Sequence, residues 1–332
     1  MARHPRRGLL LALVISAVGL HEVAAQTYTV TISASTPDLG NVVSAPTGST
    51  IFTVDEATGA VTRLSGTGVR LSTPNTRATV TVTCSNVNAC TSTNVAVRVG
   101  SIGTPAGRAG ALTNFTAASG TATISGTPTG TNPLDLTLTP LPKTGGRTFY
   151  VGADLPILAD DSGRATGAAS SGFYVYAIKS GSTPTAGSTA GLAIARVYRP
   201  ISTTLNSNLA FGRLVRPASG SGTVTVNATT GARTLTAGVA LASPAATRAS
   251  YTVTGEGGQA FSIAVPTSFV MNTGGGSLTV TTSTTASGSQ VLSSALGSAG
   301  TYGFGVGGSF PISSATAPGS YSGTFGVTVQ YN

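Results

Sequence analysis

The stretch that decides the fold class is Gly319-Ser-Tyr321-Ser-Gly323-Thr-Phe325-Gly-Val327-Thr-Val329-Gln-Tyr331-Asn332. From Tyr321 onward, every second residue is aromatic, valine or a glycine, and the residues between them are small or polar. A period of two is typical of a β-strand with one buried face. We therefore expect a final strand that lies against its own sheet or pairs with another molecule.

The same alternation recurs along the chain, and it predicts an all-β protein. The chain is rich in Thr, Ser, Ala, Val and Gly, and no convincing helical periodicity follows the N-terminal segment. Such a composition also suits a disordered chain, but disordered segments lack repeated apolar alternation. The alternating segments are Tyr28-Val30-Ile32, Val80-Val82, Val95-Val97-Val99 and Tyr251-Val253.

The chain repeats itself, which indicates two homologous domains. Leu39 to Val43 recurs as Phe211 to Val215, and at the same offset of 172 residues Phe52 to Asp55 recurs as Val224 to Asn227. Two blocks of about 150 and 140 residues are each large enough for a β-sandwich with its own core. The predicted boundaries are 26–178 for domain 1, 179–191 for a Gly/Ser/Thr linker and 192–332 for domain 2.

The N-terminus predicts a signal peptide over residues 1–25. Three arginines precede an apolar run from Gly8 to Leu20, and small residues end at Ala25, so we expect cleavage before Gln26. An uncleaved anchor is the alternative, and Arg6-Arg7 leaves a twin-arginine export route open. No later segment is apolar enough to cross a membrane as a helix. We expect an exported protein of the periplasm, the outer cell surface or the extracellular space.

The composition after residue 25 argues against an enzyme. Both histidines, His4 and His21, lie in the predicted leader, so a histidine base, a histidine metal ligand and a Ser/His/Asp triad are excluded. We expect no catalytic residue, no cofactor and no metal site. Only Asp160-Asp161, near Asp154, leaves calcium binding open, with Arg164 as the competing counter-charge.

The charge pattern gives a weak indication of partners. The 18 basic residues lose three with the leader and the nine acidic residues lose one, which leaves 15 against eight, a net charge of +7. The arginines are scattered singly, whereas nucleic-acid binding needs a basic stripe with stacking aromatics. We therefore expect no nucleic-acid partner, while a surface or polysaccharide ligand remains reasonable.

The two cysteines predict one disulfide. Cys84 and Cys90 flank a short loop between two predicted strands, and an exported protein folds in an oxidising compartment. The spacing is not that of a C-x-x-C motif, and no further cysteine or histidine follows the leader to complete a metal site.

The block from Leu205 to Asn332 resembles a bacterial envelope domain of unknown function, family 4402 (DUF4402). The resemblance rests on Phe211-Gly212, on Val306-Gly307-Gly308 and on the closing strand. That family is in turn similar to the spore-coat-U-like pilin subunits of chaperone-usher fimbriae. The resemblance implies tandem immunoglobulin-like (pilin-like) antiparallel β-sandwiches, in which a missing strand leaves a groove. It also implies three partners: a periplasmic chaperone, an usher, and a neighbouring fimbrial subunit that donates the strand.

The closing strand matches this resemblance in detail. A glycine fourteen residues from the end and a penultimate aromatic are common in such subunits, and Gly319 and Tyr331 hold these positions. The candidate assembly strand consists of Gly319, Tyr321, Phe325, Val327, Val329 and Tyr331.

The other end of the chain refines the expected role. Gln26 to Ala34 is predicted to be the first strand of domain 1, and Arg196 to Ile201 the first strand of domain 2, with no spare strand to donate. A subunit that accepts a strand but donates none belongs at a fibre tip. We therefore expect a two-domain fimbrial subunit of tip-adhesin type, with domain 2 as the acceptor. The alternative is a self-contained periplasmic or surface module, structural or carbohydrate-binding, that does not polymerise.

Overall fold

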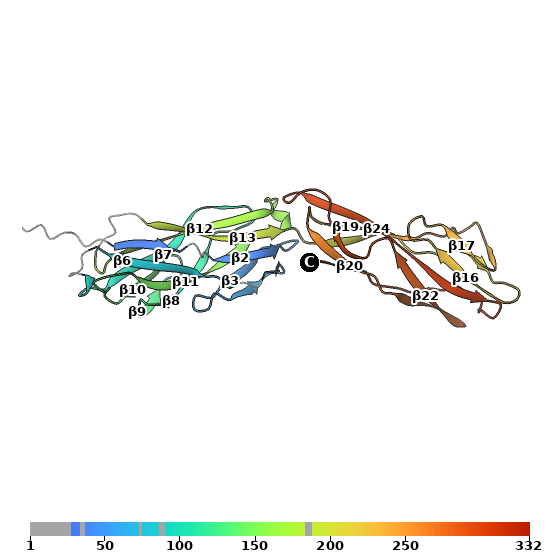
Figure 1. Ribbon diagram of the computed structural model, residues 1–332, viewed down its shortest axis with the longest axis horizontal. Coiled ribbons are helices and arrows are strands. Elements are labelled where there is room, and N and C mark those ends of the chain that lie inside the picture. The colour runs from blue at the N-terminus through green and yellow to red at the C-terminus, as the bar shows by residue number, and fades with distance from the viewer. Residues whose placement is uncertain (1–27, 34–36, 73–74, 86–89, 183–187) are drawn as a thin grey trace, which may run out of the picture.

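The computed structural model describes residues 28–33, 37–72, 75–85, 90–182 and 188–332, and it confirms the all-β prediction. Two sandwich-like parts lie end to end (Figure 1). We call residues 28–198 the first domain and residues 201–332 the second domain. The predicted signal peptide lies outside the described residues. Within the described ranges, no helix is both long and apolar enough to pass through a membrane.

The first domain consists of two facing sheets. One has the strand order β1 (Tyr28–Ile32), β6 (Ala78–Cys84), β11 (Arg147–Ile157), β3 (Thr50–Val54) and β4 (Val61–Ser65), with β8 (Thr113–Ser119) also paired to β11. The other has the order β5 (Val69–Arg70), β2 (Asp38–Val43), β13 (Thr189–Tyr198), β12 (Gly167–Lys179), β7 (Val95–Ala106), β10 (Leu134–Leu138) and β9 (Ile124–Thr129). Their inward residues form one continuous core.

The second domain repeats the first sheet but not the second. Its large sheet has the order β14 (Ser202–Ser207), β19 (Ala249–Glu256), β24 (Ala299–Ser313), β16 (Ser221–Val226) and β17 (Arg233–Leu235), and the hairpin of β21 (Ser268–Thr273) and β22 (Gly276–Thr284) joins it at β24. Opposite lie two separate pieces. They are the pair β15 (Leu214–Val215) and β18 (Val239–Ala240), and the set β23 (Gly288–Val291), β20 (Ala260–Ala264) and β25 (Thr328–Tyr331).

The internal repeat extends to individual hydrogen bonds. After β3, the Asp55 amide donates to Ala60 O at 2.9 Å, and the Gly59 amide donates to Asp55 O at 2.8 Å. At the same offset of 172, Asn227 and Ala232 form the same bond at 2.9 Å, and the amide of Gly231 donates to Asn227 O at 2.8 Å. Gly59 and Gly231 both have a φ of 74°, where a side chain would be strained. The two domains therefore share one folding plan.

The structure corrects the predicted domain boundary. Residues 189–198 form β13, which lies within the first domain between β12 and β2. The predicted start of domain 2 at residue 192, and with it a linker over 179–191, is therefore wrong, and residues 183–187 lie outside the described residues. The chain passes between the domains at Arg199 and Pro200. The first strand of the second domain is β14, not Arg196 to Ile201.

The small residues of β13 explain this error. Ala193, Ala195 and Val197 point into the core and are at most 6% exposed, and two of the three are alanines. Their small side chains give a weak apolar alternation next to a stretch rich in Gly, Ser and Thr.

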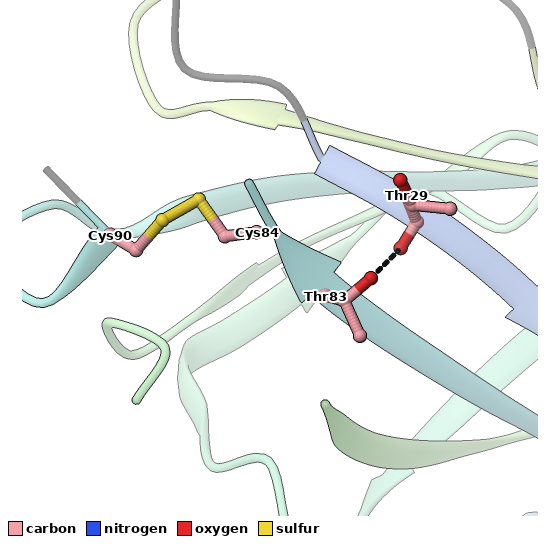
Figure 2. The surroundings of a disulfide bond; sticks show 4 residues. All are labelled: Thr29, Thr83, Cys84 and Cys90. Carbon is pink, nitrogen blue, oxygen red and sulfur yellow. Dashed lines mark hydrogen bonds between the residues drawn. A yellow bond between two sulfur atoms is a disulfide. The ribbon is translucent and has the colours of Figure 1, made fainter. Parts of the chain in front are cut away.

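The predicted disulfide between Cys84 and Cys90 is confirmed. Figure 2 shows it at the end of β6, beside a hydrogen bond of 3.4 Å from the Thr83 hydroxyl to the Thr29 carbonyl oxygen of β1. The bridge ties the end of β6 to the chain just ahead of β7. The equivalent position in the second domain is the end of β19, which has no cysteine.

We expect the disulfide to stabilise the first domain alone. Replacing both Cys84 and Cys90 by serine should lower the free energy of unfolding of that domain by about 2 kcal/mol, because the cross-link no longer restricts the unfolded chain. Calorimetry should show the transition of the first domain moving to lower temperature while that of the second is unchanged. A shift of both transitions by the same amount would contradict this view.

Candidate functional site: an open sheet edge in the second domain

The first domain contains a central strand, β13, that has no counterpart among the described strands of the second. Strand β13 runs antiparallel to β12, with Phe173 opposite Gly191, and parallel to β2, with Val197 opposite Val42. It joins the pair β2–β5 to the set β12–β7–β10, so that these strands form one sheet.

In the second domain, no described strand connects the equivalent strands. The pair β15–β18 has the register of β2–β5, since Val43 lies opposite Val69 and Val215 opposite Val239. The set β25–β20–β23 corresponds to β12–β7–β10. Among the described strands, β25 pairs only with β20 and β15 only with β18. We call the position between β25 and β15 the open edge.

The open edge leaves the last strand half-buried. In β12, the inward residues Ala169, Ser171, Phe173 and Val175 are at most 3% exposed. In the second domain, the apolar side chains of β25 and of the stretch leading into it remain half-buried: Tyr321, Phe325, Val327, Val329 and Tyr331. The difference follows from the missing neighbour, because β13 pairs with β12 from Gly167 to Val175.

The opposite side of the open edge is also less covered. Val42 of β2 is fully buried, whereas its counterpart Leu214 is half-buried. Val43 is half-buried, whereas its counterpart Val215 is 47% exposed. Apolar side chains on both sides of the open edge are therefore less covered than their counterparts in the first domain. Such an edge offers backbone hydrogen bonds and apolar contacts to an added strand.

The structure brings the residues of the candidate assembly strand together along this edge. Val329 lies opposite Ile263 of β20, and the ring of Phe325 packs in a tilted arrangement against the ring of Phe269 of β21, with centroids 5.0 Å apart. Tyr321 donates its hydroxyl proton to the carbonyl oxygen of Ala317 at 2.8 Å. The regular strand is shorter than predicted, since β25 begins at Thr328.

Two glycines explain how the earlier part of this stretch lies against β21. Gly319 has a φ of 150°, and a Cβ there would overlap the side chain of Thr273. A Cβ at Gly323 would overlap the carbonyl oxygen of Val270. Between them, Ser322 exchanges backbone hydrogen bonds with Asn272 at 2.8 and 3.1 Å. The stretch is therefore held on its β21 side, and its other side faces the open edge.

The penultimate residue has a role that the sequence did not reveal, since Tyr331 lies at the junction of the two domains. Its hydroxyl donates to the carbonyl oxygen of Arg199 at 3.0 Å and accepts from the amide of Glu256 at 2.6 Å. Its ring lies 6.2 Å from the ring of Tyr198, the last residue of β13. Burial raises the pKa of Tyr331 to about 12.

A buried carboxylate completes the junction. Glu256 is fully buried and accepts hydrogen bonds from the Thr166 hydroxyl of the first domain at 2.9 Å, from the amide of Gly297 at 2.6 Å and from the amide of Arg199 at 3.1 Å. A buried carboxylate is stable only with such partners. Glu256 therefore connects both domains to the peptide between them.

The Asp160 carboxylate, which the sequence left as a candidate calcium ligand, forms hydrogen bonds with two arginines. It accepts from Arg108 at 2.5 Å and from Arg199 at 3.4 Å. The predicted counter-charge Arg164 contributes its carbonyl oxygen to Arg108 instead. Within the described ranges, no three His, Cys, Asp or Glu side chains cluster as metal ligands would.

We expect the hydroxyl of Tyr331 to stabilise the second domain. The substitution Tyr331→Phe should lower the free energy of unfolding by about 1–3 kcal/mol, because the amide of Glu256 loses its partner in a partly buried place. Tyr321→Phe removes a hydroxyl that makes one bond near the surface, so it should cost less. Urea unfolding of both variants measures the difference, and equal costs would contradict the proposed role of Tyr331.

The same hydroxyl predicts a dependence on alkaline pH. In the unfolded chain, tyrosine ionises near its ordinary pKa of 10.0, whereas in the fold Tyr331 stays protonated until about pH 12. The stability that the raised pKa provides is therefore complete below pH 10 and is lost as the pH rises toward 12. Between pH 9 and about pH 11, the wild type should lose stability more steeply than Tyr331→Phe in urea unfolding. Parallel curves would show that burial does not affect this group.

A comparison with known proteins identifies the second domain. No curated protein matches the chain. Residues 201–331 match the family model described as Domain of unknown function (DUF4402), from the start of β14 to the end of β25. The open edge therefore lies entirely within the matched residues, and the predicted DUF4402-like domain is confirmed.

Proposed function

We propose that this chain is a non-enzymatic, exported cell-surface protein of fimbrial type, in which the second domain accepts a β-strand from a partner chain. The observation that carries the proposal is the open edge between β25 and β15. In the first domain, β13 occupies the equivalent position and completes the sheet. The shared folding plan of the two domains supports it, because β13 fills this position in the first domain and no described strand fills it in the second.

The first domain indicates what kind of strand would fit. Strand β13 presents Ala193, Ala195 and Val197 to the core, while Leu192 and Ile194 face outward and are 50% and 37% exposed. An added strand in the second domain would therefore present small or β-branched residues at alternate positions. Complete burial of one valine stabilises by about 1.5–3 kcal/mol, so several half-buried side chains along the edge offer substantial affinity.

The path of the chain supports assembly in a line. Strand β13 completes the first domain and leads directly into β14 of the second, so it acts as a donated strand within one chain. Strand β25 ends at the domain junction, near Arg199 (Figure 1). A strand antiparallel to β25 would begin near the junction and leave at the far end of the second domain. A partner chain would then continue the line of the two domains.

The proposal predicts that a peptide with the sequence of β13 binds the second domain. The peptide Thr189–Tyr198 should bind the full chain with one site, because the position in the first domain is already occupied by β13 itself. Binding should also raise the melting temperature of the second domain, since a ligand of the folded state stabilises it. Isothermal titration calorimetry and thermal unfolding measure the two effects.

Two peptide variants provide a matched control. Ala195→Asp places a charge on the inward face and should weaken binding at least about tenfold, since an unpaired charge is costly to bury. Ile194→Asp places the same charge on the outward face and should bind nearly as well as the parent. Equal affinity of the two variants, or no binding of the parent by a second domain that melts cooperatively, would favour a self-contained surface module.

A further inference from the structure

The first domain carries a row of polar and aromatic side chains on the outer face of its second sheet. Tyr176 of β12 lies opposite Arg98 of β7, Arg98 opposite Asp135 of β10, and Asp135 opposite Thr129 of β9. Residues in register on neighbouring strands lie on the same face of the sheet. The row therefore crosses four neighbouring strands.

This row lines a groove of about 450 Å³, which lies outside the open edge and belongs to the other domain. Besides the row itself, Ser125, Thr127 and Thr137 line it. A volume of this size lies within the range of small-ligand sites, roughly 300–1,000 Å³. Its lining is mainly polar and contains one aromatic ring.

An exposed, neutral ion pair lies within the groove. The Arg98 Nε and Nη2 atoms donate to the two carboxylate oxygens of Asp135 at 2.6 and 2.8 Å, and the side chains are 41% and 42% exposed. The hydrogen bond to Asp135 raises the pKa of Arg98, so the guanidinium stays charged. The pair presents planar donors and acceptors side by side, with no net charge.

A flat aromatic surface adjoins this ion pair. The rings of Tyr174 and Tyr176 are nearly parallel, with an interplanar angle of 7° and centroids 6.1 Å apart. The Tyr174 ring lies over Gly100, where a Cβ would overlap it. Aromatic rings held flat on a sheet provide an apolar platform with a polar hydroxyl at one end.

We propose that this groove binds a neutral glycan. The C–H face of a pyranose ring packs on an aromatic ring, and its adjacent hydroxyl groups donate to a carboxylate and accept from a guanidinium. Tyr176, Arg98 and Asp135 provide these three elements in one row, and the threonine and serine hydroxyls extend it. Because Asp135 neutralises Arg98, the groove gives little attraction to an anionic sugar.

The groove lies at the end of the first domain that is remote from the second. Thr166, just before β12, contacts Glu256 at the domain junction. Tyr176 and Ile178 lie near the other end of β12, and a strand of this length spans roughly 40 Å at about 3.3 Å per residue. A chain held through its second domain would present the groove outward, although the groove itself does not depend on the open edge.

Titration of the full chain with sugars tests the proposal. The probes are the neutral disaccharides lactose, maltose, cellobiose and mannobiose, with sialyllactose as the anionic counterpart, and saturation-transfer NMR detects binding. We expect binding of at least one neutral disaccharide, weakened at least about tenfold by Tyr176→Ala and by Asp135→Asn. Tyr150→Ala is the matched control, because it removes a half-buried tyrosine from the outer face of the opposite sheet, and binding should be unchanged.

The outcomes separate the proposal from a merely structural role. If Tyr176→Ala lowers the melting temperature of the first domain, Tyr176→Val keeps a strand-forming residue and repeats the comparison. No binding of any neutral probe, binding of sialyllactose alone, or equal affinity in Tyr176→Ala and Tyr150→Ala would overturn the proposal. The strand-binding experiment on the second domain is unaffected by any of these results.

Discussion

A strand at the edge of a sheet has backbone hydrogen-bonding groups that need partners, and this requirement governs the whole molecule. In the first domain, β13 supplies the partners for both β12 and β2. In the described part of the second domain, no strand does the same for β25 and β15. Unpaired edges of this kind tend to pair with a strand of another chain unless the fold covers or blocks them.

The missing strand also divides the second core. The first domain has one cluster of buried residues that spans both sheets, whereas the second has one cluster around Phe261 and Phe304 and another around Phe211 and Phe310. A split core buries less apolar surface, and burial of apolar surface is the main source of folding stability. An added strand would extend from β25 to β15 and would thus bring the two clusters under one sheet.

The sequence predicted the elements that depend on local pattern. Period-two alternation identified the all-β fold, the repeat indicated two similar domains, and the spacing of Cys84 and Cys90 indicated their bridge. The place of β13 could not be predicted in this way. Its inward alanines give little apolar signal, and its parallel pairing joins Val197 to Val42, more than 150 positions earlier. The junction role of Tyr331 likewise depends on a contact with Arg199 that no local pattern encodes.

The C-terminal stretch from Ser322 to Tyr331, which ends in β25, is held in place at both ends although its outer side is open. Near its start, Ser322 is bonded to Asn272, and at its end the hydroxyl of Tyr331 is bonded to Glu256 and Arg199. Binding costs less free energy when the acceptor is already ordered, because little further freedom is lost. The contacts at the domain junction therefore serve the open edge as well, since they keep β25 extended and in register for a strand that pairs with it.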